Sequence, residues 1–205
     1  AFVEGLVYRV GGVEFVVLLP YVSKEYANYC CEEVYQRFQE KWQVGDAEYL
    51  VRVGICDMII DQNSADAGEQ IEKMQYAQEM VKEKKESCIL HFDDHVRKKL
   101  ERRKYLIGRM KQAIREGGFE MYYQPIYSWK EKRFLSMEAL LRLRDHDGTL
   151  ISPAEFIPVF ERDGNICALD FYMLDRVCHD IREWIEQGLK PVTVSVNFSK
   201  THLHD

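Results

Sequence analysis

Three side chains in the second half of the chain are of types that can bind metal ions or phosphate. Glu138 and Arg142 lie four residues apart in a β-rich run, so they share one face of a strand. Asn197 ends another β-rich run. Carboxylate and amide oxygens suit hard divalent cations, and a guanidinium group can bind phosphate. Taken alone, however, these patterns favour an exposed strand glutamate and a capping asparagine.

The surrounding pattern places these residues on strands that alternate with helices. β-Rich runs at 120–127 and 134–144 predict two strands, and VTVSVNF at 192–198 predicts a third. Ser152 followed by Pro153 predicts the start of a helix, and apolar spacing predicts a longer helix over about 167–187. This order fits the opening of a (β/α) barrel, in which the C-terminal strand ends face the active site.

Two aspartates, Asp145 and Asp147, occupy the loop that follows the second of these runs. The Asp-Gly pair at 147–148 predicts a turn, and Asp145 is interpreted as part of the same solvated loop. The histidines of His202-Leu203-His204 could bind a metal ion from a strand, but an incidental pair is the favoured interpretation.

A predicted helix over 94–116 precedes the barrel segment. Its apolar residues form a narrow stripe between charged flanks, and Gly117-Gly118 end it. This pattern is typical of a connector that packs against a domain or a partner helix. The basic run RKKLERRK at 97–104 is interpreted as a solvated face of this helix rather than as a membrane or phosphate contact.

The first 93 residues predict a different α/β arrangement. Runs at 6–10 and 14–19 flank Gly11 and Gly12, which predicts a β-hairpin because glycine adopts the positive φ angles of a tight turn. Further elements are a helix from Ser23 to about Lys41, a strand over 49–60, a helix that begins at Ser64 or Asp66, and a strand over 88–92. The order β-β-α-β-α-β predicts part of an α/β sandwich.

Composition and charge limit the classes of function. Of the 205 residues, 46% are hydrophobic and 30% charged, which is typical of a globular protein, and the net charge of −6 argues against binding to polymeric nucleic acid. The six cysteines form no C-x-x-C pair, so we expect reduced thiols and a cytoplasmic location. No apolar run has the ~20 residues needed to span a bilayer, although segments outside this chain could anchor it.

Four motifs in the second half resemble the EAL domain family in order and spacing. They are YQPI at 123–126, MEALLR at 137–142, SPAEFIP at 152–158 and VSVNFS at 194–199. The resemblance implies a TIM-like barrel that opens cyclic di-GMP to the linear dinucleotide with Mg²⁺ or Mn²⁺. It assigns Glu138 as a catalytic metal ligand and Asn197 as a second ligand. It also assigns Gln124, Leu140 and Arg142 to substrate binding, although a purely structural strand role for Gln124 has equal weight.

Two-metal hydrolysis of a phosphodiester needs more carboxylates than this chain supplies. The family takes a further glutamate, a pair of aspartates, a lysine and another glutamate from later strands, which we expect beyond Asp205. The 205-residue chain alone is therefore predicted to be inactive. Its incomplete barrel edge is expected to be covered by a second copy or to be partly disordered.

The segment RVGGVEF at 9–15 resembles the signature of the GGDEF diguanylate cyclases. Its positions are Gly11, Gly12, Val13, Glu14 and Phe15. The first acid of the family signature is here Val13, whose side chain has no oxygen to ligate magnesium. The inhibitory R-x-x-D site of the family would fall at Phe2 and Gly5 and is absent. We therefore predict a degenerate domain without cyclase activity, and leave open whether it binds GTP.

These resemblances divide the chain into three parts. Residues 1–93 are predicted to be the C-terminal part of a degenerate GGDEF domain, 94–116 a linker helix, and 117–205 the N-terminal part of an EAL domain. The predicted role is cyclic di-GMP signalling by a homodimer. Two alternatives stay open, namely a non-catalytic cyclic di-GMP receptor and a scaffold that dimerises through the 94–116 helix.

Overall fold

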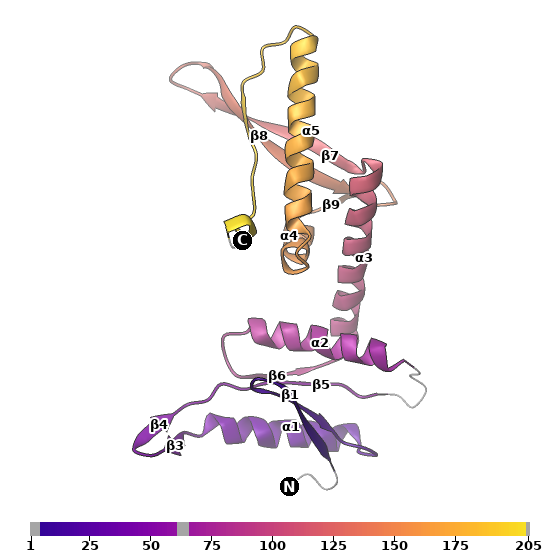
Figure 1. Cartoon of the computed structure of the whole chain (residues 1–205), viewed down its shortest axis with the longest axis vertical. Coiled ribbons are helices and arrows are strands. Elements are labelled where there is room, and N and C mark those ends of the chain that lie inside the picture. The colour runs from indigo at the N-terminus through magenta and orange to yellow at the C-terminus, as the bar shows by residue number, and fades with distance from the viewer. Residues whose placement is uncertain (1–4, 61–65, 204–205) are drawn as a thin grey trace. The chain divides into compact units, whose positions relative to one another are not determined.

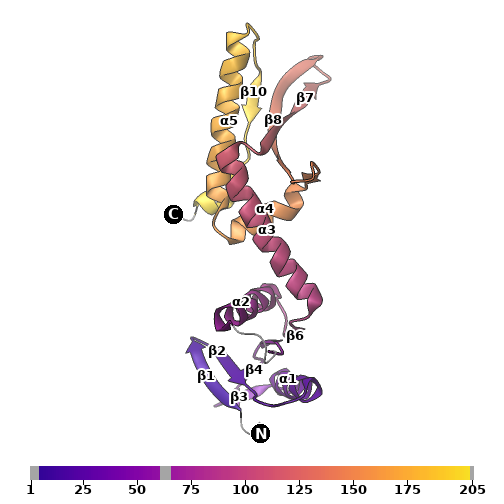
Figure 2. The same ribbon diagram turned by 90° about the vertical axis from the view of Figure 1, so that its right-hand side faces the viewer.

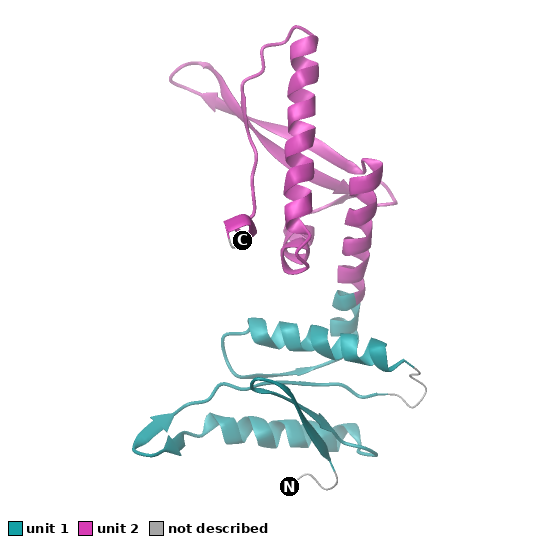
Figure 3. Cartoon of the chain, viewed as in Figure 1, with its two compact units in different colours: residues 1–100 teal, residues 101–205 magenta. Residues whose placement is uncertain are grey.

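The computed structural model describes residues 5–60 and 66–203 of the chain. They form two compact units, Ala1–Leu100 and Glu101–Asp205, shown in teal and magenta in Figure 3. Helix α3 (Asp94–Glu116) contributes residues to both units, and it has the bounds that the sequence predicts for the connecting helix.

The described residues of the first unit form three separate two-stranded sheets, two complete helices and the start of α3 (Figure 1). The predicted hairpin is confirmed as β1 (Leu6–Gly11) and β2 (Glu14–Leu18), with Gly12 at a φ of +46° in the turn. The remaining elements are α1 (Lys24–Gln39), β3 (Trp42–Val44), β4 (Ala47–Tyr49), β5 (Gly54–Asp57), α2 (Ala67–Glu83) and β6 (Cys88–His91).

Both predicted helix starts in this unit are supported by side-chain caps. The Ser23 hydroxyl accepts from the Tyr26 N–H, and an Asp66 carboxylate oxygen accepts from the Gly68 N–H. Of the two alternatives for α2, Asp66 is therefore the cap, whereas Ser64 lies outside the described residues.

The predicted strand over 49–60 is wrong in its extent. Tyr49 instead closes a β3–β4 hairpin that turns at Gly45, and β5 begins only at Gly54. A Cβ at position 54 would lie 2.1 Å from Val81 Cγ1 of α2, so glycine permits the close approach of this helix to β5. The β-branched composition of 49–60 indicated strand propensity but not where partner strands would begin and end.

The second unit is a mixed four-stranded sheet with helices against one face. Strands β7 (Phe119–Ser128) and β8 (Arg133–Arg144) form an antiparallel hairpin, and β9 (Leu150–Ile151) pairs with the end of β8. Helices α4 (Pro153–Arg162) and α5 (Ile166–Glu186) follow, and the chain then returns as β10 (Thr193–Ser195), parallel to β8 (Figure 2).

The core of the second unit fixes which face of β8 is buried. Ala139, Leu141 and Leu143 are at most 8% exposed, and because side chains alternate along a strand they share one face. That face packs against residues of α3, α4 and α5, among them Met110, Phe156, Phe160, Leu169 and Met173. The opposite face of β8 therefore carries Glu138, Leu140 and Arg142.

The strand predicted over 192–198 is shorter than expected. Only Thr193–Ser195 pair with β8, after which the chain leaves the sheet and forms a 3₁₀ turn, η1 (Lys200–Leu203). Beyond the strand, residues 199 and 202 hydrogen-bond to Asp170 of α5 instead of pairing with β8. Within the described residues, no helix has both the length and the apolar character to cross a membrane.

Candidate functional site

Strand register brings four of the predicted site residues onto one face of the second unit. Gln124 pairs directly with Glu138 across the β7–β8 hairpin, and Ser195 of β10 pairs with Glu138 from the other side. Cross-strand partners point to the same face, and residues two apart along a strand do so as well. Gln124, Glu138, Leu140 and Arg142 therefore lie on the face opposite the core.

The carboxamide of Asn197 reaches Glu138 at the end of β10. Asn197 Nδ2 donates to Glu138 Oε1 at 2.7 Å, across 59 residues of sequence. Glu138 is half-buried in the middle of the sheet, whereas Asn197 is exposed. The two residues that the motifs assign as metal ligands thus lie in direct contact, while their metal-binding role stays a prediction.

Arg142 lies farther along the same face of β8. Its guanidinium carbon is 5.7 Å from the centre of the Tyr122 ring, and one N–H donates to the Leu141 carbonyl at 2.9 Å. Leu140 pairs with Tyr122 across the hairpin. Since a guanidinium group has five N–H donors, Arg142 keeps donors that could bind a phosphate.

The donor types and spacing fit part of a divalent cation site. Two neighbouring oxygens around an octahedral Mg²⁺ are about 3 Å apart, given metal–oxygen distances of about 2.1 Å. A half-turn of the Asn197 carboxamide would place its oxygen, rather than its nitrogen, close to the Glu138 carboxylate. Glu138 and Asn197 could therefore supply two ligands. Among the described residues no group of three or more His, Cys, Asp or Glu side chains could hold a metal ion.

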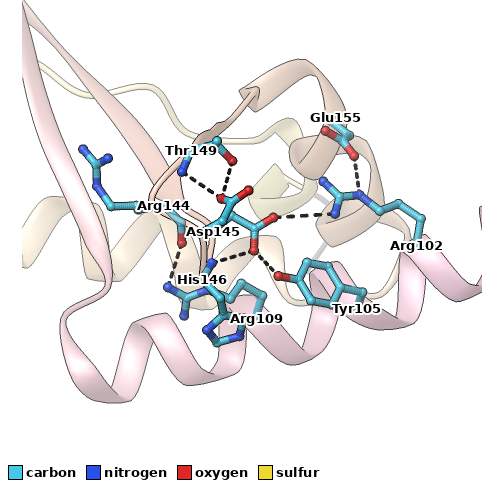
Figure 4. Close-up of polar contacts among 9 residues, drawn as sticks. Arg102, Tyr105, Arg109, Arg144, Asp145, His146, Thr149 and Glu155 are labelled. Carbon is cyan, nitrogen blue, oxygen red and sulfur yellow. Dashed lines mark hydrogen bonds and ion pairs between the residues drawn. The ribbon is translucent and has the colours of Figure 1, made fainter.

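A polar cluster ties the end of β8 to α3 and α4 (Figure 4). The Tyr105 hydroxyl of α3 donates to the Asp145 carboxylate in the loop after β8. Arg102 donates from Nε to Glu155 Oε1 of α4 at 2.7 Å and lies 3.8 Å from Asp145. Arg109 donates to the Arg144 carbonyl at 2.7 Å.

This cluster corrects the interpretation of Asp145 as part of a solvated loop. Asp145 is instead a half-buried partner of α3, while Asp147 makes the predicted turn by accepting from the Thr149 N–H and hydroxyl. The contact between residues 105 and 145 spans 40 residues, and nothing in the local sequence signals it.

Replacing Tyr105 with phenylalanine is expected to flatten the acid dependence of stability. The Tyr105 hydrogen bond holds the pKa of Asp145 below its usual value, with smaller contributions from the His146 N–H and Arg102. A lowered folded-state pKa stabilises the protein above about pH 4, and this stabilisation is lost as the pH falls through the folded-state value. Urea midpoints at pH 5 and pH 3 should therefore differ less in Tyr105→Phe than in the unmodified chain. Tyr127→Phe, at an exposed tyrosine, should leave the difference unchanged.

The GGVEF hairpin of the first unit has little capacity to bind metal. Val13 is 90% exposed at the turn, where it offers no oxygen. The acid that remains, Glu14, pairs with Lys82 of α2, and this hydrogen bond lowers the pKa of Glu14. Arg9 Nε donates to the Gly12 carbonyl at 2.8 Å, which stabilises the turn. Gly11 opens the turn, and Phe15 pairs with Arg9 across the hairpin.

Comparison with known proteins confirms the resemblance of the second half. The family model described as the EAL domain matches residues 107–205. The chain is 27% identical over 198 residues to the signaling protein YkoW of Bacillus subtilis. The aligned residues cover 96% of this chain and 25% of that protein.

Two further relatives come from Pseudomonas aeruginosa. The bifunctional diguanylate cyclase/cyclic di-GMP phosphodiesterase MucR is 23% identical, over 96% of this chain and 29% of that protein. The cyclic di-GMP phosphodiesterase NbdA is 26% identical, over 97% of this chain and 25% of that protein. The chain thus spans roughly a quarter of the length of these curated relatives.

Solved structures similar to the chain include the MucR phosphodiesterase in complex with c-di-GMP. The two sequences are 29% identical, and the matched region covers 46% of this chain and 38% of the MucR chain, with a TM-score of 0.43. An S helix-GGDEF-EAL structure of Vibrio cholerae LapD covers 98% of this chain and 46% of that chain, with 14% identity and a TM-score of 0.47.

Proposed function

We propose that this chain, whose residues 107–205 match the EAL domain family, is part of a longer protein that hydrolyses cyclic di-GMP to the linear dinucleotide. The supporting observation is the contact between Glu138 and Asn197 on the face that also carries Arg142. An acid, an amide and a guanidinium group on one open face match the needs of a metal-dependent phosphodiesterase.

Each of these residues has a distinct part in the proposed reaction. Glu138 and Asn197 would hold Mg²⁺ or Mn²⁺, and the bound ion would supply activation of water and neutralisation of charge on the phosphate. Arg142 donates hydrogen bonds to phosphate oxygens, and this orients the scissile bond. Gln124 hydrogen-bonds the dinucleotide, and Leu140 contacts its apolar surface. Further ligands would come from a complete TIM-like barrel.

A product assay tests the proposal. The natural full-length protein, incubated with Mn²⁺ and cyclic di-GMP, should release the linear dinucleotide, and a chelator should stop the release. The 205-residue chain by itself should release none. Binding of cyclic di-GMP by the full-length protein without turnover would favour a receptor instead. The absence of both binding and turnover would contradict a nucleotide function.

For residues 1–93 we propose a regulatory domain of GGDEF type. In the same proposal residues 94–116 are a linker helix and residues 117–205 belong to the EAL domain. The pairing of Glu14 with Lys82 and the valine at position 13 support a domain without cyclase activity. GTP binding at this domain, a homodimer and a cytoplasmic location belong to the same proposal.

A further inference from the structure

Asp170 of α5 is an unusual residue in the second unit. In the part of the chain that the structure describes it is the only buried charged side chain, with 5% of its surface exposed. Burial of a carboxylate costs free energy of folding unless the group accepts hydrogen bonds. The hydrogen-bond partners of Asp170 therefore indicate its role.

Both partners of Asp170 come from the segment that follows β10. Asp170 Oδ2 accepts from the Ser199 N–H at 2.9 Å and lies 2.9 Å from His202 Nε2. An ionised carboxylate can only accept, so this contact is a hydrogen bond in the tautomer of His202 that has its proton on Nε2. The carboxylate therefore fixes one backbone amide and one side chain of residues 199–202 to the helix.

Two neighbouring contacts fix the same segment. The Ser199 hydroxyl donates to Glu161 Oε1 of α4 at 2.8 Å. The ring of Phe171, next to Asp170, lies 6.2 Å from the ring of Phe198 and 5.4 Å from that of His202, measured between centroids. Residues 198–202 are thus held against the first turns of α5.

Asn197 lies between this anchor and the short strand β10. Before it, the chain is paired with β8 through Ser195, and two residues after it the Ser199 amide is held by Asp170. The Asn197 side chain itself is exposed and contacts Glu138. Since Leu169 and Met173 on either side of Asp170 are core residues, α5 provides a rigid reference for this segment.

We propose that Asp170 is a positioning residue that holds Asn197 in reach of Glu138. This inference rests on the proposed function only for the role of Asn197 as a metal ligand. Asp170 does not touch either predicted ligand but acts through Ser199 and His202. Groups hydrogen-bonded directly to a metal ligand typically change metal affinity by about 10- to 100-fold, and since Asp170 acts through Ser199, we expect its effect at the lower end of this range.

Side-chain NMR of the 205-residue chain tests the positioning directly, without metal or substrate. The sequence has only four asparagines, so labelling with ¹⁵N-asparagine gives four side-chain amide signals, and Asn197→Ser identifies that of Asn197. Asp170→Ala should move the Asn197 signal towards its position in Glu138→Ala, where the hydrogen bond is absent. Asp170→Asn keeps an acceptor oxygen, so in this variant the Asn197 signal should lie close to its position in the unmodified chain. Asp175→Ala, at an exposed aspartate of α5, should leave the signal unchanged.

A second variant and a second measurement keep the test decisive. Because Asp170→Ala also alters the core, His202→Ala removes one of the two donors from a less buried position and should move the Asn197 signal in the same direction. In the full-length protein, Asp170→Ala should weaken Mn²⁺ affinity about 10-fold or more. An unmoved Asn197 signal in a folded but destabilised Asp170→Ala chain would overturn the proposal. A different outcome would overturn only the proposed metal role of Asn197 and Glu138. In that case the NMR shifts are as predicted, but the unmodified full-length protein does not bind Mn²⁺.

Discussion

Replacing Glu138 with alanine is expected to abolish metal-dependent hydrolysis of cyclic di-GMP by the full-length protein. Loss of an outer-shell partner of a metal ligand costs about 10- to 100-fold, so loss of a direct ligand should lower turnover by more than about 100-fold. The substitution removes the carboxylate that accepts from Asn197, and no oxygen remains at position 138 to bind a cation. Turnover at saturating cyclic di-GMP and Mn²⁺ is the quantity to compare.

A matched control separates this effect from damage to the sheet. Ser136 lies two residues before Glu138 on the same face of β8 and pairs with Thr193 of β10. Ser136→Ala should retain turnover close to that of the unmodified protein. Retention of activity in Glu138→Ala would contradict the ligand assignment, as would equal losses in both variants.

Replacing Phe156 with alanine is expected to cost about 3–5 kcal/mol of the free energy of unfolding of the second unit. The Phe156 ring is 0% exposed and lies between the rings of Phe119 and Phe160, with centroid distances of 6.5 and 5.4 Å. Its removal leaves a cavity where β7 and α4 meet the core. Hydrogen exchange of peptides from 101–205 should report the loss without requiring both units to unfold together.

Ile157, the next residue on α4, provides the control. Its side chain is 37% exposed, so Ile157→Ala should change the exchange free energy by less than about 1 kcal/mol. Equal effects of the two substitutions would show that the packing around Phe156 does not hold this unit together.

Local signals in the sequence predicted the elements that depend on local structure. The turn at Gly12, the Ser23 cap and the end of α3 at Gly117 all follow from backbone geometry that few other residues permit. Strand extents were predicted less well, because the ends of a strand depend on its partners. Thus 192–198 has the composition of a strand, yet pairing with β8 ends at Ser195.

The candidate site shows the same division between local and distant information. The resemblance to the EAL family implied a shared site for Glu138 and Asn197, and the two side chains lie in contact. The contacts of Asp170 and Asp145 were not predicted, because their partners lie 29 to 40 residues away. A buried aspartate in an amphipathic helix resembles any surface aspartate until the fold shows what covers it.

The most direct test of a cation shared by Glu138 and Asn197 is titration of the ¹⁵N-asparagine-labelled full-length protein with Mn²⁺. Paramagnetic Mn²⁺ broadens the signals of nearby nuclei, so the Asn197 side-chain signal should broaden before that of Asn165, which pairs with Asp163 at the start of α5. In Glu138→Ala this selective broadening should disappear. Equal broadening of the two signals, or an Asn197 response that survives the loss of Glu138, would contradict the account.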